Sequence, residues 1–157
     1  EIIVHGPQVM RGYRSKEGSA EALRVLDGKV YMYTGDIGAM DDEGYVRLCD
    51  RSKDMLIVGG YKLFSVEVEH KLAALPFIAM TALVGKPDEA RPGNDIARLF
   101  VQKKPGLPYT DEQLRQEILA FCRSNLAPYK VPREIVFVDA IPLTSVGKID
   151  KKALRVR

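Results

Sequence analysis

Short apolar runs separated by polar turns fill the first fifty residues of the chain. Their length and their β-branched and aromatic content are typical of strands, which we expect at residues 2–4, 30–33, 37–40 and 45–48. The acidic stretch from Asp41 to Gly44 separates the last two runs and predicts a hairpin turn. We therefore expect this segment to be rich in β-structure.

After residue 54 the pattern changes to a mixture of strands and amphipathic helices. Gly59 and Gly60 separate two apolar runs and tolerate the positive φ angles of a tight hairpin turn. Helical spacing predicts two helices, the first capped by Ser65 and the second opened by a capping box of Thr110 and Gln113. Further strands are expected at residues 80–84, 97–102 and 135–138. This order predicts an α+β fold in which two helices cover a short mixed sheet beside a β-hairpin.

Composition excludes several classes of protein. The 157 residues are 46% hydrophobic and 29% charged, which is typical of a globular chain with a core, and no apolar run approaches a transmembrane span. A net charge of +3 and the absence of Trp give no support for nucleic-acid binding. Cys49 and Cys122 stand far apart among apolar neighbours, which favours reduced thiols in a cytoplasmic protein and leaves peripheral membrane attachment open.

Conventional catalytic groups are few. His5 and His70 lie far apart, no His/Cys metal spacing occurs, and we expect no metal site in the chain. Gly147-Lys148 is followed by Ile149 rather than by Ser or Thr, so a phosphate-binding P-loop is absent.

Three stretches could still carry chemistry. The carboxylate of Asp36 ends a strand-like run after Thr34-Gly35 and could accept hydrogen bonds from a diol such as ribose. Residues 50–54 hold four charges in five positions, and residues 142–148 place Lys148 on a loop that could bring a cation to developing negative charge. Taken singly, each also fits an ordinary explanation: a turn aspartate, an exposed linker and a surface lysine.

Taken together, six motifs resemble the superfamily of acyl-CoA synthetases, nonribosomal-peptide adenylation domains and beetle luciferases. They are EIIVHGPQVMRGY at 1–13, YTGD at 33–36, DRSKD at 50–54, GYK at 60–62 with EVE at 67–69, LAPYKVP at 126–132 and PLTSVGK at 142–148. Enzymes of this superfamily join a carboxylate to ATP and then pass the acyl group from acyl-AMP to a thiol. A C-terminal lid rotates between the two steps.

The resemblance implies a role for particular residues in adenylation. Asp36 would hold the ribose hydroxyls of ATP or AMP, and Arg51 would assist it. Lys53 stands at the position of the hinge. Lys148 would be the adenylation lysine, which reaches the carboxylate and the α-phosphate.

For the second step, the resemblance implies that Gly59, Gly60 and Lys62 lie along the passage for the pantetheine arm of CoA. Lys62 replaces the more familiar Arg, and a lysine can bind a phosphate but is less suited to bidentate contact. Ile57 stands where some relatives carry a lysine that serves this step, so that contact is missing.

The resemblance also implies the organisation of the chain. Residues 1–50 would be the β-rich end of the N-terminal adenylation body, and residues 51–157 would be the lid. ATP, with Mg²⁺ bound by the absent body, and CoA would be the cofactors. The chain begins at Glu1 without an initiator Met, so we expect a catalytically incomplete part of a longer polypeptide.

The favoured function is that of a fatty-acid–CoA ligase, because residues 59–65 resemble that branch and no carrier domain follows Arg157. The determinants of the acyl chain would lie in the missing body. Two alternatives stay open: an adenylation domain that loads a carrier protein, and a non-catalytic binding module with the lid fold. Against the second stands the presence of Asp36, Arg51 and Lys148 together.

Overall fold

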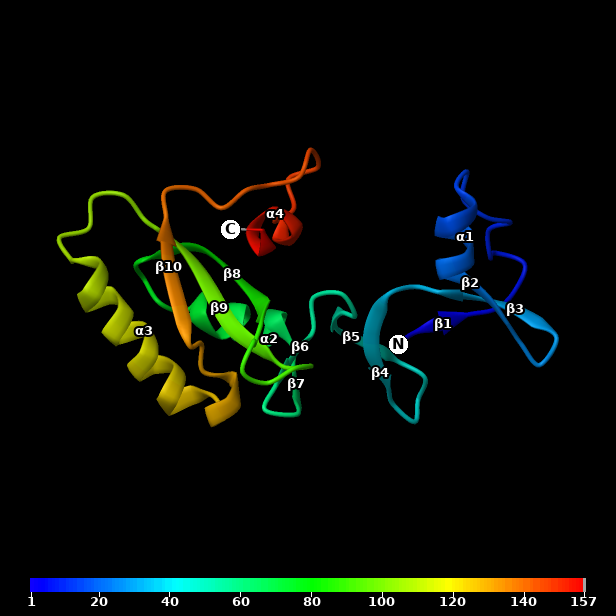
Figure 1. The fold of residues 1–157 in the computed structure, drawn as a ribbon, viewed down its shortest axis with the longest axis horizontal. Helices are drawn as coiled ribbons and strands as arrows, with labels where there is room; N and C mark the ends of the chain where they lie inside the picture. The colour runs from blue at the N-terminus through cyan, green and yellow to red at the C-terminus, as the bar shows by residue number, and fades with distance from the viewer. Residues whose placement is uncertain (157) are drawn as a thin grey trace. The chain divides into compact units, whose positions relative to one another are not determined.

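The computed structural model describes residues 1–156 and divides the chain into two compact units, Glu1–Lys53 and Asp54–Arg157. The first unit runs from blue to cyan in Figure 1, and the second from green to red. Each unit is described by itself. None of the described helices is long and apolar enough to cross a membrane.

The first unit consists of short strands and one helix. Its elements are β1 (Ile3–Val4), α1 (Lys16–Ala22), β2 (Leu23–Leu26), β3 (Lys29–Tyr33), β4 (Asp36–Met40) and β5 (Val46–Arg51). They form an antiparallel sheet in the order β1-β3-β2 and a separate β4–β5 hairpin. The four strands expected from the sequence are present, whereas α1 and β2 were not expected. The sequence of α1 lacks an apolar stripe, and none of its residues is buried.

The second unit contains the core. Its elements are β6 (Leu56–Val58), β7 (Tyr61–Leu63), α2 (Ser65–Leu72), β8 (Ile78–Pro87), β9 (Asp95–Lys103), α3 (Asp111–Asn125), the 3₁₀ turn η1 (Pro128–Lys130), β10 (Glu134–Val138) and α4 (Lys151–Arg155). The three longest strands form a sheet in the order β10-β9-β8, with β8 antiparallel and β10 parallel to β9. The predicted α+β fold with a hairpin and a mixed sheet is confirmed.

Alternating side chains of β9 face opposite sides of this sheet, as the two-residue period of a strand requires. Leu99 and Val101 pack into one apolar cluster with Ile118 of α3, and residues of α2 belong to the same cluster. Phe100 packs into a second cluster with Leu154 of α4. The two long helices therefore cover one face, and the short C-terminal helix covers the other (Figure 1).

The two predicted helix starts have different outcomes. The capping box of Thr110 and Gln113 is present at the start of α3, as predicted. Ser65 as the cap of α2 is wrong: the N-cap is Phe64, and Ser65 is the first helical residue. Its hydroxyl is buried and accepts a hydrogen bond from Lys151, a contact that the local sequence pattern does not contain.

The two units divide between Lys53 and Asp54, whereas the sequence places a boundary after residue 50. The difference arises because Arg51 is the last residue of β5 and pairs with Asp36 in the β4–β5 ladder. Residues 51–53 thus belong to the first compact unit.

Candidate functional site

Asp36 and Arg51 form an ion pair at the open end of the β4–β5 hairpin. They are direct partners in the ladder, and Arg51 Nε lies 3.1 Å from Asp36 Oδ1. The Asp36 side chain is 32% exposed and that of Arg51 is 68% exposed, so water and small molecules can reach both groups. The arrangement presents hydrogen-bond acceptors for hydroxyls beside a guanidinium that suits phosphate.

The backbone before Asp36 is fixed by local hydrogen bonds. Thr34 Oγ1 accepts from the Asp36 N–H at 3.1 Å and donates to the Ile2 carbonyl at 2.8 Å. Gly35 takes a positive φ of 75°, and its carbonyl accepts from the Ser52 N–H at 2.8 Å. The Thr-Gly-Asp sequence therefore forms a defined corner that orients the Asp36 carboxylate.

A hollow of about 510 Å³ opens beside this corner. Arg51, Lys53 and Arg24 contribute positive charge to its wall, and Glu1 and Glu21 contribute negative charge. The guanidinium of Arg24 also lies 4.2 Å from the centre of the Tyr33 ring, a cation–π contact that holds both side chains.

Lys53 lies in an exposed turn that follows β5. It is the last residue of the first compact unit. The chain therefore passes from one unit to the other at the position predicted for the hinge, and rotation there stays a prediction.

Gly59 and Gly60 form the turn between β6 and β7, with φ angles of 59° and 82°. A Cβ added at either position would meet no heavy atom within 4 Å. These glycines are therefore required by backbone conformation and not by crowding within this chain. Lys62 lies next to the turn on β7 and is exposed.

Two residues at the start of β9 hold this turn from outside the hairpin. Asn94 Oδ1 accepts from the Gly60 N–H at 3.0 Å, and Asp95 Oδ2 accepts from the Ile57 N–H at 2.9 Å. Gly85 makes room for Asp95, because a Cβ at Gly85 would lie 3.0 Å from the Asp95 carboxylate. In the sequence, Pro-Gly-Asn-Asp at 92–95 indicates a turn, but it does not reveal that Asn94 and Asp95 bind the backbone of Gly60 and Ile57.

A groove of about 830 Å³ lies beside the hairpin. Gly59 lines it, together with Tyr61 and Tyr129, whose rings stack at 4.9 Å between centroids. Its charged wall consists of three arginines and two aspartates: Arg91, Arg123, Arg133, Asp88 and Asp95. The groove combines aromatic surface with guanidinium groups.

An ion pair holds the 3₁₀ turn that carries Tyr129. Lys130 Nζ donates to both carboxylate oxygens of Glu67, at 2.7 and 2.6 Å. This hydrogen bonding to Glu67 raises the pKa of Lys130 above its ordinary value. The LAPYKVP segment is thereby tied to α2.

Lys148 lies on an exposed loop whose base is closed by backbone contacts. The Thr144 N–H donates to the Lys148 carbonyl at 2.7 Å, and Leu143 pairs with Ile149 in an isolated antiparallel bridge. Gly147, with a φ of 77°, completes the turn. The loop therefore has a defined backbone and presents the Lys148 side chain to solvent.

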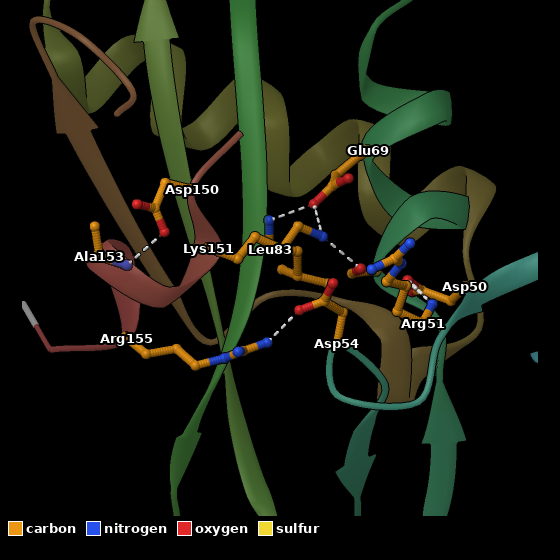
Figure 2. A network of polar contacts seen from close by, with 10 residues as sticks. Asp50, Arg51, Asp54, Glu69, Leu83, Asp150, Lys151, Ala153 and Arg155 are labelled. Carbon is orange, nitrogen blue, oxygen red and sulfur yellow. Dashed lines mark hydrogen bonds and ion pairs between the residues drawn. The ribbon is translucent and has the colours of Figure 1, made fainter. Parts of the chain in front are cut away.

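The helix after this loop is anchored by polar contacts, which Figure 2 shows. Lys151 Nζ lies 2.8 Å from Glu69 Oε1, and the same oxygen accepts from the Leu83 N–H at 2.7 Å. Arg155 pairs with Asp54. In the sequence, Glu69 was included in a motif without being given a role, and Lys151 was not identified as a residue of interest.

The structure thus brings Asp36 and Arg51 together in the first unit, and Gly59, Gly60 and Lys62 together on one hairpin of the second. Lys148 lies on a separate loop of the second unit. Within residues 1–156, no three His, Cys, Asp or Glu side chains gather in a way that could hold a metal ion.

Comparison with protein families gives a match over residues 67–148 to the AMP-binding enzyme C-terminal domain. The chain belongs to this family. The match runs from the glutamate that pairs with Lys130 to the exposed Lys148, so it includes the Lys148 loop and the part of the groove wall that follows Glu67, but not Gly59 or Tyr61.

Individual relatives match the chain almost end to end, beyond the limits of this domain. It is 43% identical over 156 residues to the 2-methylpropanoate–CoA ligase of Humulus lupulus, covering 99% of this chain and 27% of that protein. It is 44% identical over 155 residues to the long-chain-fatty-acid–CoA ligase of Bacillus subtilis, covering 98% of this chain and 26% of that protein. The chain thus spans about a quarter of the length of these CoA ligases.

A solved structure agrees with this family membership. ATP-bound MatB from Rhodopseudomonas palustris superposes with a TM-score of 0.80 at 30% sequence identity, covering 99% of this chain and 30% of that one. The similarity therefore extends through both compact units.

Proposed function

We propose that the chain is the C-terminal part of an AMP-forming acid–thiol ligase. Such an enzyme converts a carboxylic acid and ATP to acyl-AMP and pyrophosphate, and then transfers the acyl group to CoA. The observation that carries the proposal is Lys148, a cation on an exposed loop of defined backbone, in a chain that belongs to the AMP-binding enzyme C-terminal domain family. Both relatives described above bear the name of CoA ligases.

In this proposal each group of residues serves one step. Asp36 accepts hydrogen bonds from the ribose hydroxyls of ATP, and Arg51 keeps its carboxylate oriented. Lys148 stabilises the charge that develops at the α-phosphate and carboxylate. When the lid has turned about Lys53, Gly59 and Gly60 leave space for the pantetheine arm, and Lys62 lies near enough to the turn to bind a phosphate of CoA.

The proposal also requires a larger body that precedes the lid. None of the first 53 residues is buried, and large apolar side chains such as Val25, Met40 and Leu48 are exposed. Because a segment without a core gains little from hydrophobic burial, this unit is expected to fold as part of a larger domain. That body would supply Mg²⁺ ligands, the remaining ATP contacts and the acid pocket.

A fatty acid is the favoured substrate, on the ground that residues 59–65 resemble the fatty-acid branch of the superfamily. The two relatives differ in the acids their names specify, one branched and short and the other long, yet their identities to this chain are 43% and 44%. Selection among acids therefore belongs in the proposed body, and the C-terminal part serves the chemistry that all acids share.

The test is Lys148→Ala in the full-length enzyme. The rate of acyl-AMP formation, measured as pyrophosphate release, should fall ~10²-fold. This loss is equivalent to about 3 kcal/mol of transition-state stabilisation. Thioester formation from preformed acyl-AMP and CoA should persist, because the rotated lid carries this loop away from the reacting atoms.

Lys104→Ala is the matched control, since Lys104 is an exposed lysine on the loop between β9 and α3. It should leave both half-reactions intact. An unchanged rate of acyl-AMP formation in Lys148→Ala would refute the proposed role, and equal losses in both half-reactions would indicate a structural role instead.

A further inference from the structure

Lys151 is a largely buried lysine that the proposed function does not use. Its side chain is 12% exposed, which is unusual for a lysine unless the charge is paired. Its Nζ lies 2.8 Å from Glu69 Oε1 (Figure 2). The same Nζ donates to Ser65 Oγ at 2.6 Å. The Glu69 side chain is 16% exposed, and Ser65 is fully buried.

These contacts join three elements at one point. Glu69 and Ser65 lie on α2, and Lys151 is the first residue of α4. Glu69 Oε1 also accepts from the Leu83 N–H on β8 at 2.7 Å, as Figure 2 shows. A single carboxylate oxygen therefore fixes α4 and α2 to the central sheet.

The network lies three residues beyond Lys148. The intervening backbone is held in place, because Ile149 pairs with Leu143 and the Asp150 N–H donates to the Pro142 carbonyl at 2.8 Å. A displacement of the start of α4 would therefore reach the base of the Lys148 loop. The Asp150 carboxylate, which accepts from the Ala153 N–H at 3.0 Å, adds a cap to the same turn.

The helix cannot hold this position by itself. Five residues are too few for a stable isolated helix, so α4 depends on tertiary contacts. Those contacts include the burial of Leu154, the pair of Arg155 with Asp54, and the Lys151 network. Of these, the network is nearest in sequence to the loop.

We propose that Lys151, Glu69 and Ser65 form a positioning network that sets the geometry of the Lys148 loop for acyl-AMP formation. This inference rests on the proposed function of Lys148. Its physical basis is that a charged group displaced by about 1 Å can lose ~10²-fold in rate without losing substrate binding. Lys151 itself touches no reacting atom.

The test is Lys151→Met in the full-length enzyme, which keeps most of the length of the side chain and removes its charge. The kcat of acyl-AMP formation should fall at least ~10-fold with the KM for ATP little changed. Thioester formation from preformed acyl-AMP should stay near wild type. Lys151→Arg should recover most of the activity, because a guanidinium can pair with Glu69.

Lys152→Ala provides the matched control, since Lys152 is the exposed neighbour on the same helix and should behave as wild type. If Lys151→Met does not fold, Glu69→Gln replaces it: this variant keeps an oxygen acceptor for the Leu83 N–H and removes the charge pair. It should show the same selective loss of acyl-AMP formation.

A double variant separates positioning from general damage. If Lys151 acts only through Lys148, then Lys148→Ala/Lys151→Met should form acyl-AMP no more slowly than Lys148→Ala. An additive loss, an equal loss in both half-reactions, or a wild-type rate in Lys151→Met would overturn the inference. Failure of the proposed function has a separate signature, namely a wild-type rate of acyl-AMP formation in Lys148→Ala.

Discussion

The turn at Gly59 allows the proposed thiol passage to be tested against simple backbone strain. In Gly59→Ala the new methyl group would meet no atom of this chain within 4 Å, so steric crowding adds nothing. The cost comes from the φ of 59°, which an L-residue adopts at about 1–2 kcal/mol. A smaller gain of about 0.4–1 kcal/mol comes from the lower entropy of the unfolded chain. The net destabilisation should be about 1 kcal/mol.

Gly106 provides a control with the same strain. It lies in the loop between β9 and α3, has a φ of 74°, and a Cβ there also meets nothing within 4 Å. Gly59→Ala and Gly106→Ala should therefore lower the thermal midpoint of residues 54–157 by similar amounts, about 5 °C for a domain of this size. Circular dichroism measures this shift.

The two positions should differ in catalysis when leucine is introduced. In the full-length enzyme, Gly59→Leu should reduce thioester formation from preformed acyl-AMP by ~10²-fold, because the side chain obstructs the arm that delivers the thiol. Acyl-AMP formation should be spared, and Gly106→Leu should spare both steps. The reasoning fails if Gly59→Leu forms thioester normally, or if the two leucine variants lose the same activity.

Two further predictions concern the division of the chain. Lys53→Pro fixes φ at the proposed hinge and should impair one half-reaction of the full-length enzyme while it spares the other; equal losses measured in the two half-reaction assays would contradict rotation at this residue. Residues 54–157 expressed alone should show a cooperative thermal transition, because every buried core residue lies within them, whereas residues 1–53 alone should show none. A non-cooperative melt of residues 54–157, or a cooperative one of residues 1–53, would show that the units do not divide the stability in this way.

Two features that depend on neighbouring residues were predicted correctly. The Gly59-Gly60 turn has the expected positive φ angles, and the capping box of Thr110 and Gln113 opens α3. Both depend on the conformational range of glycine and on side chains that reach the backbone three residues away. The alternation along β9 is also local, and it fixes which residues face which side of the sheet.

The roles assigned to Asp36, Arg51 and Lys148 came from motif resemblance, and they stay predictions. The structure adds geometry that the motifs do not contain. Asp36 and Arg51, at opposite ends of a hairpin in sequence, become direct partners, and Lys148 gains a loop with a closed base. Residues so far apart in the chain meet only when the strands between them pair.

The tertiary structure alone decided which polar residues are buried. Lys151 stands beside Lys152, and lysines are ordinarily exposed, yet Lys151 contacts Ser65, 86 residues away, and pairs with Glu69. Ser65 was given a local capping role because its distant partner, Lys151, is not visible in the sequence around it. Burial depends on which elements pack together, and a charged side chain is recognised as buried only when its distant partner is known. The sequence by itself therefore determined most of the strands, the two longer helices and the motifs. The packing of α4 against α2 and β8 determined the contacts that anchor the helix following Lys148.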